Sequence, residues 1–152
     1  MKNSIEAFTE RLINKGESAL LDARYYGLTV NDVITAFENA GLEEPVKVVE
    51  NTWLPRKSGS VGLRFDFGWG NGYVKIVPGH QFHKVPYDDF YVNVHGGLTF
   101  SEEIKPDDNY LPEGYWVGFD TAHSSDTLQK WPRSRVYQET LSLFAQLYGL
   151  EY

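Results

Sequence analysis

All four histidines of this 152-residue chain lie between positions 80 and 123, and several carboxylates occupy the same stretch. Imidazole and carboxylate groups ligate metals, transfer protons and orient polar ligands. We therefore expect any chemistry of this protein to be located there. The residues concerned are His80, His83, His95, His123, Asp88, Asp120 and Asp126, together with Tyr87 and the glycine pair Gly96 and Gly97.

The first two histidines, His80 and His83, have a spacing that can chelate a metal ion. Both lie in a loop that follows a predicted strand. Zinc sites require at least three protein ligands, however, and an H-x-x-H pattern in a loop is not specific. For this pair alone we favour the alternative, in which His80 hydrogen-bonds the loop backbone and His83 faces solvent.

His95 ends a predicted strand and is followed directly by Gly96 and Gly97. Glycines let backbone amides approach a ligand closely, so an anion or a carbonyl oxygen could bind here beside an imidazole that exchanges protons. A bulge that turns the strand, with His95 as a satisfied polar group at its end, explains the same pattern. Both interpretations stay open.

His123 is bracketed by two carboxylates, Asp120 and Asp126, directly after the last predicted strand. Asp120 could orient the imidazole by accepting its ring N–H, as in metal sites and in acid–base catalysis. Alternatively, these are ordinary turn and cap residues, with Asp126 beginning a short helical turn. The run 87–89 is expected to be a polar loop, one of whose acids could join a cation site.

Composition excludes several classes of function. The chain has no cysteine, which excludes disulfides, zinc–thiolate sites and thiol nucleophiles. Its formal net charge is −7 and it carries no basic stripe, which disfavours broad nucleic-acid binding. Its first residues lack the apolar run of a signal peptide, and no apolar run has membrane-spanning length, so we expect a soluble protein located in the cytoplasm of a bacterial host, with no membrane partner.

The elements that must position these residues can be predicted from periodicity. Apolar residues recur at helical spacing near both ends of the chain. Ser4 and Thr29 are possible N-caps, the latter with Asp32 three positions later, and Gly16 is typical of a helix end. The predicted helical segments are 4–15, 17–26, 29–41 and 134–150.

Alternating apolar residues predict strands in the middle of the chain. We expect a hairpin in which 61–69 turns through Gly70-Asn71-Gly72 into 73–77. Together the segments predict an α+β fold in a single domain, 1–152, with a helical portion, 1–44, and a sheet-rich portion, 45–152. Its antiparallel sheet, of about four to six strands, is packed by N-terminal helices and a C-terminal helix. The other predicted strands are 46–49, 90–95, 98–100 and 115–120.

Several short motifs follow one another along the second half of the chain. They are Gly72-Tyr73-Val74, Pro78-Gly79-His80, Tyr87-Asp88-Asp89, Val94-His95-Gly96-Gly97-Leu98-Thr99-Phe100-Ser101, Tyr115-Trp116-Val117-Gly118-Phe119-Asp120-Thr121-Ala122-His123, Asp126-Thr127-Leu128 and Trp131-Pro132. In this order they resemble a family of small uncharacterised phage and prophage proteins. The resemblance covers about residues 70–147, and the family's signature implies no role for His83. It supplies context and no established activity.

Three functions follow as hypotheses. In the first, an accessory protein of phage type binds a small nucleotide-like ligand in a polar His/Asp pocket, by analogy to counter host defence signalling. The ligand-binding residues would be His80, Tyr87, Asp88, His95, Gly96, Gly97, Asp120, His123 and Asp126.

In the second hypothesis, the protein is a hydrolase with a divalent metal as its cofactor. The metal ligands would be His80, His95, His123 and Asp120 or Asp126. In the third, an acidic surface occupies a host protein and no small ligand binds. Each hypothesis is compatible with a homo-oligomer.

Overall fold

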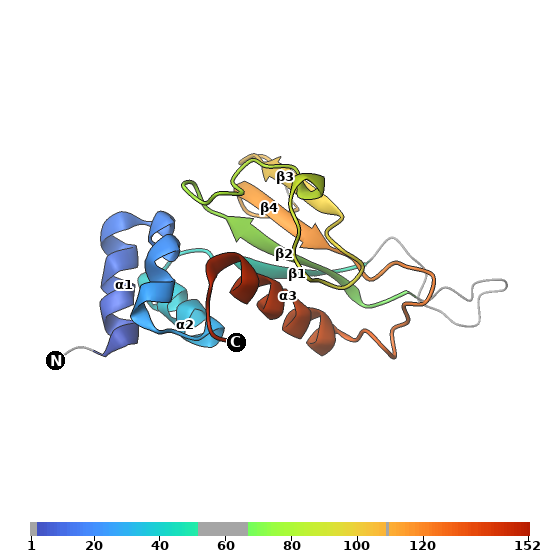
Figure 1. Cartoon of the computed structure of the whole chain (residues 1–152), viewed down its shortest axis with the longest axis horizontal. Coiled ribbons are helices and arrows are strands. Elements are labelled where there is room, and N and C mark those ends of the chain that lie inside the picture. Colours follow the sequence, from blue (N-terminus) through green and yellow to red (C-terminus); the bar gives the residue numbers. More distant parts are fainter. Residues whose placement is uncertain (1–2, 52–66, 109) are drawn as a thin grey trace.

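The computed structural model describes residues 3–51, 67–108 and 110–152, and its architecture is α+β as predicted (Figure 1). The helices are α1 (Ser4–Lys15), the 3-10 helix η1 (Glu17–Tyr26), α2 (Val30–Ala40), the short 3-10 turn η2 (Tyr87–Asp89) and α3 (Arg133–Tyr148). The strands are β1 (Val46–Glu50), β2 (Gly70–Ile76), β3 (Phe100–Ile104) and β4 (Gly114–Phe119).

The N-terminal helices begin and end where local capping chemistry requires. The α2 helix starts with a complete capping box, in which Thr29 and Asp32 each bond the other's backbone amide. The cap of α1 is Asn3 rather than the predicted Ser4, because Asn3 Oδ1 accepts the backbone N–H of Glu6 at 2.8 Å. The predicted helices over 4–15 and 29–41 are therefore confirmed, and the segment 17–26 is a 3-10 helix.

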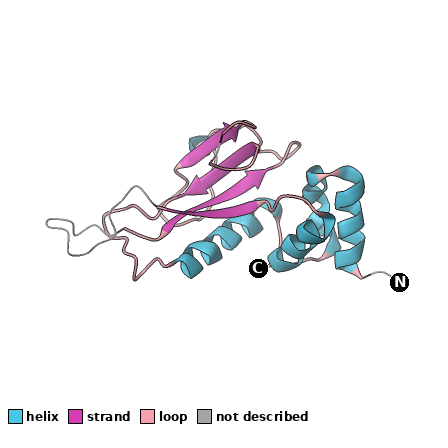
Figure 2. Cartoon of the chain, turned by 180° about the vertical axis from the view of Figure 1, so that it is seen from behind, coloured by secondary structure: helices cyan, strands magenta, loops and turns pink. Residues whose placement is uncertain are grey.

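The sheet has four antiparallel strands in the order β1-β2-β4-β3. Helix α3 lies along one face of this sheet, and α1, η1 and α2 stand beyond its end (Figure 2). Apolar side chains of α3, including Val136, Leu143 and Phe144, are fully buried in the core. Among the described residues, no helix is both long and apolar enough to cross a membrane.

The predicted turn at Gly70-Asn71-Gly72 is wrong, because these residues lie inside strand β2. Gly72 pairs with Val48 on one side and with Phe119 on the other. A Cβ at Gly72 would collide with the Thr140 hydroxyl of α3, so this glycine permits close helix–sheet packing rather than chain reversal. Most of the predicted partner arm, residues 61–66, lies outside the described residues.

The predicted strand at 90–95 is also wrong, since this segment pairs with no strand among the described residues. Its backbone is bound instead by side chains of α3. The Gln146 amide accepts the Asn93 N–H at 2.9 Å and donates to the Asn93 carbonyl at 2.7 Å. Glu139, two helical turns earlier, accepts the N–H of His95 at 2.7 Å. Helix side chains thus replace a neighbouring strand.

Candidate functional site: a His–Asp–His cluster

His95, His123 and Asp126 meet near the first turns of α3. His95 comes from the loop that Glu139 holds, whereas His123 and Asp126 come from the connection between β4 and α3. One ligand atom from each residue lies within 4.8 Å of the other two. Among the described parts of the chain, this is the one group of three or more side chains placed to hold a metal ion.

Asp126 is the centre of this group, and its side chain is only 2% exposed. Its Oδ1 accepts a hydrogen bond from His95 Nε2 at 2.8 Å. Its Oδ2 accepts from His123 Nδ1 and from the His123 backbone N–H, both at 3.0 Å. Burial by itself would raise the pKa of Asp126, but these hydrogen bonds outweigh it and lower the pKa below its usual value. The carboxylate form is therefore favoured.

The connection between β4 and α3 is fixed by the strand ends beside it. Thr121 is fully buried, and its hydroxyl donates to the Gly70 carbonyl at 2.6 Å. The Gly68 N–H donates to the Thr121 carbonyl at 2.7 Å. A backbone turn from Asp126 N to His123 O then sets the spacing of the acid and the imidazole. The cluster therefore follows an anchored segment at the end of the interior strand β4.

The ring of His95 is held by aromatic packing. Its centroid lies 4.1 Å from that of Trp131, a buried residue just before α3, and 5.5 Å from that of His123. The side chains of His95 and His123 are 25% and 39% exposed, so solvent reaches both imidazoles. In the part of the chain that the structure describes, neither His95 Nδ1 nor His123 Nε2 has a hydrogen-bond partner.

Gly96 and Gly97 form the turn that brings His95 to His123. Gly96 has a φ of +70°, and a Cβ there would collide with the imidazole of His123. The Gly97 N–H donates to the Val94 carbonyl at 2.9 Å, which closes the turn. The space that Gly96 leaves is thus filled by a side chain of the protein itself.

Asp120 adjoins the cluster without being its centre. Its Oδ1 lies 3.5 Å from His123 Nδ1 and accepts the Ala122 N–H at 3.1 Å. The sequence favoured Asp120 as the partner of His123, but Asp126 is closer and binds both imidazoles. Both carboxylates lie three residues from His123 in the chain, so the spacing alone could not distinguish them.

His80 does not join the cluster. Its Nε2 donates to the Leu147 carbonyl at 2.7 Å, and its Nδ1 accepts the Phe82 N–H at 3.0 Å. Burial lowers the pKa of His80, which agrees with a neutral ring that uses both nitrogens within the protein.

Tyr87 and Asp88 are exposed in η2 and take no part in the cluster. The His83 ring packs edge-on against Tyr115.

Comparison with protein-family models, with curated proteins and with solved structures finds no match to this chain. The site must therefore be interpreted from its own chemistry. Two imidazole nitrogens and one carboxylate can hold a transition metal with open coordination positions. Without a metal, the same carboxylate orients two imidazoles whose remaining nitrogens can exchange protons.

Proposed function

We propose that this protein binds a divalent transition-metal ion through His95, His123 and Asp126 and uses it to hydrolyse a small polar substrate. The convergence of the three ligand atoms within 4.8 Å carries the proposal. Catalytic zinc sites commonly have three nitrogen or oxygen ligands from the protein and keep one position open for water. A metal in such a site lowers the pKa of bound water to near neutrality.

The surroundings of the three ligands support a metal centre. The His123 N–H orients the Asp126 carboxylate, and Glu139 fixes the backbone of His95. Hydrogen bonds to the ligand residues hold those residues in place in known metal centres. Asp120, 33% exposed and beside His123, is a carboxylate that can accept a proton from an attacking water.

Metal content tests the first step. Protein purified without a histidine tag is expected to hold about one equivalent of metal per chain by elemental mass spectrometry. His95→Ala and His123→Ala should lose it, whereas His83→Ala, which removes a histidine outside the cluster, should keep it. A wild-type protein that stays metal-free after incubation with Zn²⁺, Mn²⁺ or Fe²⁺ would overturn the proposal.

Hydrolysis is tested with chromogenic esters. We expect metal-loaded protein to hydrolyse bis(p-nitrophenyl) phosphate or p-nitrophenyl acetate, and Asp120→Asn to retain the metal but lose most of the rate, about tenfold or more. If both esters remain intact while the metal is bound, the hydrolytic part of the proposal fails and the metal-binding part stands.

A second candidate is capture of a nucleotide-like ligand without turnover, by a protein of phage type that counters host defence signalling. One observation favours it: the Arg135 guanidinium lies 4.1 Å over the ring of Trp131, which also packs against His95. An exposed guanidinium beside a polar cluster suits the anionic group of such a ligand. Mass spectrometry of nucleotides released by heating untreated protein distinguishes this candidate from the hydrolase.

A further inference from the structure

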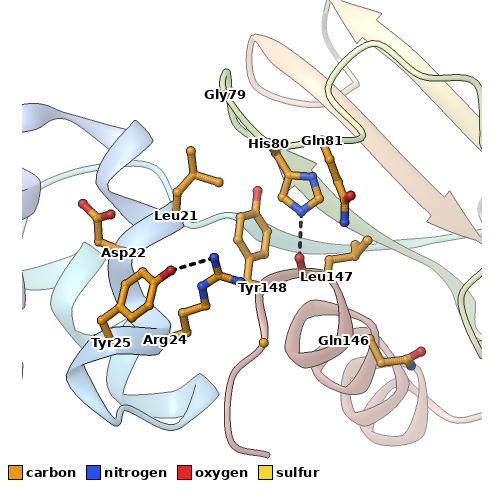
Figure 3. A pocket seen from close by; sticks show the side chains of 11 residues that line it. Leu21, Asp22, Arg24, Tyr25, Gly79, His80, Gln81, Gln146, Leu147 and Tyr148 are labelled. Atoms are coloured by element: carbon orange, nitrogen blue, oxygen red, sulfur yellow. Dashed lines mark hydrogen bonds between the residues drawn. The ribbon is translucent and has the colours of Figure 1, made fainter.

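A cavity that shares no residue with the His–Asp–His cluster lies beside His80, where three elements meet. It has a volume of about 570 Å³, within the range of small-molecule sites. Figure 3 shows side chains from η1, from the loop after β2 and from the end of α3 around it. Its lining residues are Leu21, Asp22, Arg24, Tyr25, Gly79, His80, Gln81, Gln146, Leu147, Tyr148 and Gly149.

The walls of this cavity are fixed by close contacts. Gly79 has a φ of +96°, and a Cβ there would lie 2.9 Å from the Leu21 side chain. The buried hydroxyl of Tyr148 donates to the Lys75 carbonyl at 2.7 Å and accepts the Val77 N–H at 3.0 Å. His80 is bonded to the Leu147 carbonyl. These contacts fix the wall formed by Gly79, His80 and Tyr148.

Arg24 supplies a positive charge that no carboxylate neutralises among the described residues. Its guanidinium donates to Tyr25 Oη at 2.8 Å, and its stem passes over Gly149. The carboxylate of Asp22, which also lines the cavity, is bound by Arg11 at 3.1 Å. An unpaired guanidinium at a cavity suits a ligand carboxylate, which it can bind through two parallel hydrogen bonds.

The C-terminus of α3 supplies the opposite polarity. Within the described residues, the backbone carbonyls of Gln146 and Tyr148 accept no hydrogen bond, because the Gly149 and Leu150 N–H groups both donate to Ala145. The end of a helix carries partial negative charge and attracts hydrogen-bond donors and cations. A ligand that satisfies both ends of the cavity therefore needs an ammonium group as well as an anionic one.

From this arrangement we infer that the cavity binds a small zwitterion of amino-acid size. Its carboxylate pairs with Arg24, its ammonium group donates to the carbonyls at the end of α3, and Leu21 and Leu147 offer apolar surface to its side chain. The inference is independent of the proposed metal centre, because the two sites share no residue.

Binding is tested by NMR titration of the full-length, ¹⁵N-labelled protein with three related probes. Phenylalanine carries both charges, N-acetylphenylalanine only the negative one and phenylalaninamide only the positive one. We expect phenylalanine to shift the amides of η1, residues 79–81 and residues 146–149. The other two probes should bind at least about tenfold more weakly, since each lacks one charged hydrogen-bonding group.

Variants place the ligand within the cavity. Arg24→Gln should weaken phenylalanine binding about tenfold or more, whereas Arg133→Gln, an exposed arginine at the other end of α3, should not. Circular dichroism and melting curves confirm that both variants are folded. Treatment with EDTA should leave binding unchanged, so failure of the metal proposal does not affect this result.

Three outcomes would overturn the inference. The first is an absence of shifts with phenylalanine at millimolar concentration, and the second is shifts located away from the cavity. The third is equal binding of phenylalanine and N-acetylphenylalanine, because it would show that the carbonyls at the end of α3 contact no ammonium group.

Discussion

His95 and His123 donate to opposite oxygens of the same buried carboxylate, Asp126, at 2.8 and 3.0 Å. His95 lies 31 residues before Asp126 in the chain, and His123 only three before it. The carboxylate therefore joins a loop held by α3 to the turn that follows β4. It positions both imidazoles and ties two parts of the fold together, so changes at Asp126 should affect function and stability alike.

We expect Asp126→Asn to destabilise the protein by about 1–3 kcal/mol, because the neutral amide cannot accept all three hydrogen bonds that the buried carboxylate accepts. Urea denaturation followed by circular dichroism measures this free energy. Asp120→Asn, at a more exposed carboxylate with one backbone hydrogen bond, should cost less. Equal losses in the two variants would show that Asp126 is not the centre of the cluster.

Addition of Zn²⁺ should raise the melting temperature of the wild-type protein, since a ligand that binds only the folded state stabilises it. His123→Ala should show no such increase, and EDTA should reverse the increase in the wild type. If Zn²⁺ raises the melting temperature of His123→Ala as much as that of the wild type, the stabilising metal binds elsewhere.

Gly72→Ala should destabilise the protein by about 1–3 kcal/mol, because the added methyl group collides with Thr140 of α3 and with the ring of Phe119. Thr140→Ala removes one of the two obstacles. The double variant should therefore lose less stability than the sum of the single variants. Strict additivity in thermal or urea unfolding would mean that Gly72 does not set the packing distance of α3.

His80 should make the free energy of unfolding depend on pH. Burial lowers its pKa in the folded protein relative to the value of about 6.5 in the unfolded chain. Between these two pKa values the unfolded state binds more protons, so stability rises with pH and falls as the solution is acidified. NMR titration of the His80 ring should give a pKa below 6.5, and His80→Asn should flatten the stability profile. A ring that titrates above 6.5 would contradict this prediction.

Gln146→Ala should release the loop before His95, because it leaves the N–H and carbonyl of Asn93 without their partners in α3. We expect faster hydrogen exchange at Asn93 and its neighbours, while amides of the sheet stay protected. Gln129→Ala, an exposed glutamine outside α3, is the matched control. Unchanged exchange at Asn93 would show that the loop is held by other contacts.

Local chemistry made part of the fold predictable. The capping box of Thr29 and Asp32 and the glycine after each N-terminal helix act within a few residues, so the sequence determined where those helices begin and end. The segment 90–95 could not be predicted in the same way. It alternates like a strand, but its backbone partners are side chains of a helix about fifty residues later, and no local pattern encodes them.

The sequence by itself determined the chemical types available to the site: imidazoles and carboxylates, without thiols. Tertiary structure alone decided which of them meet. It separated His80, whose two nitrogens bond the backbone of Phe82 and Leu147, from His95 and His123. In the folded protein Asp126, and not Asp120, binds both imidazoles, because only the Asp126 carboxylate lies between the two rings. Residue type is a local property, whereas a distance between segments depends on how the whole chain packs.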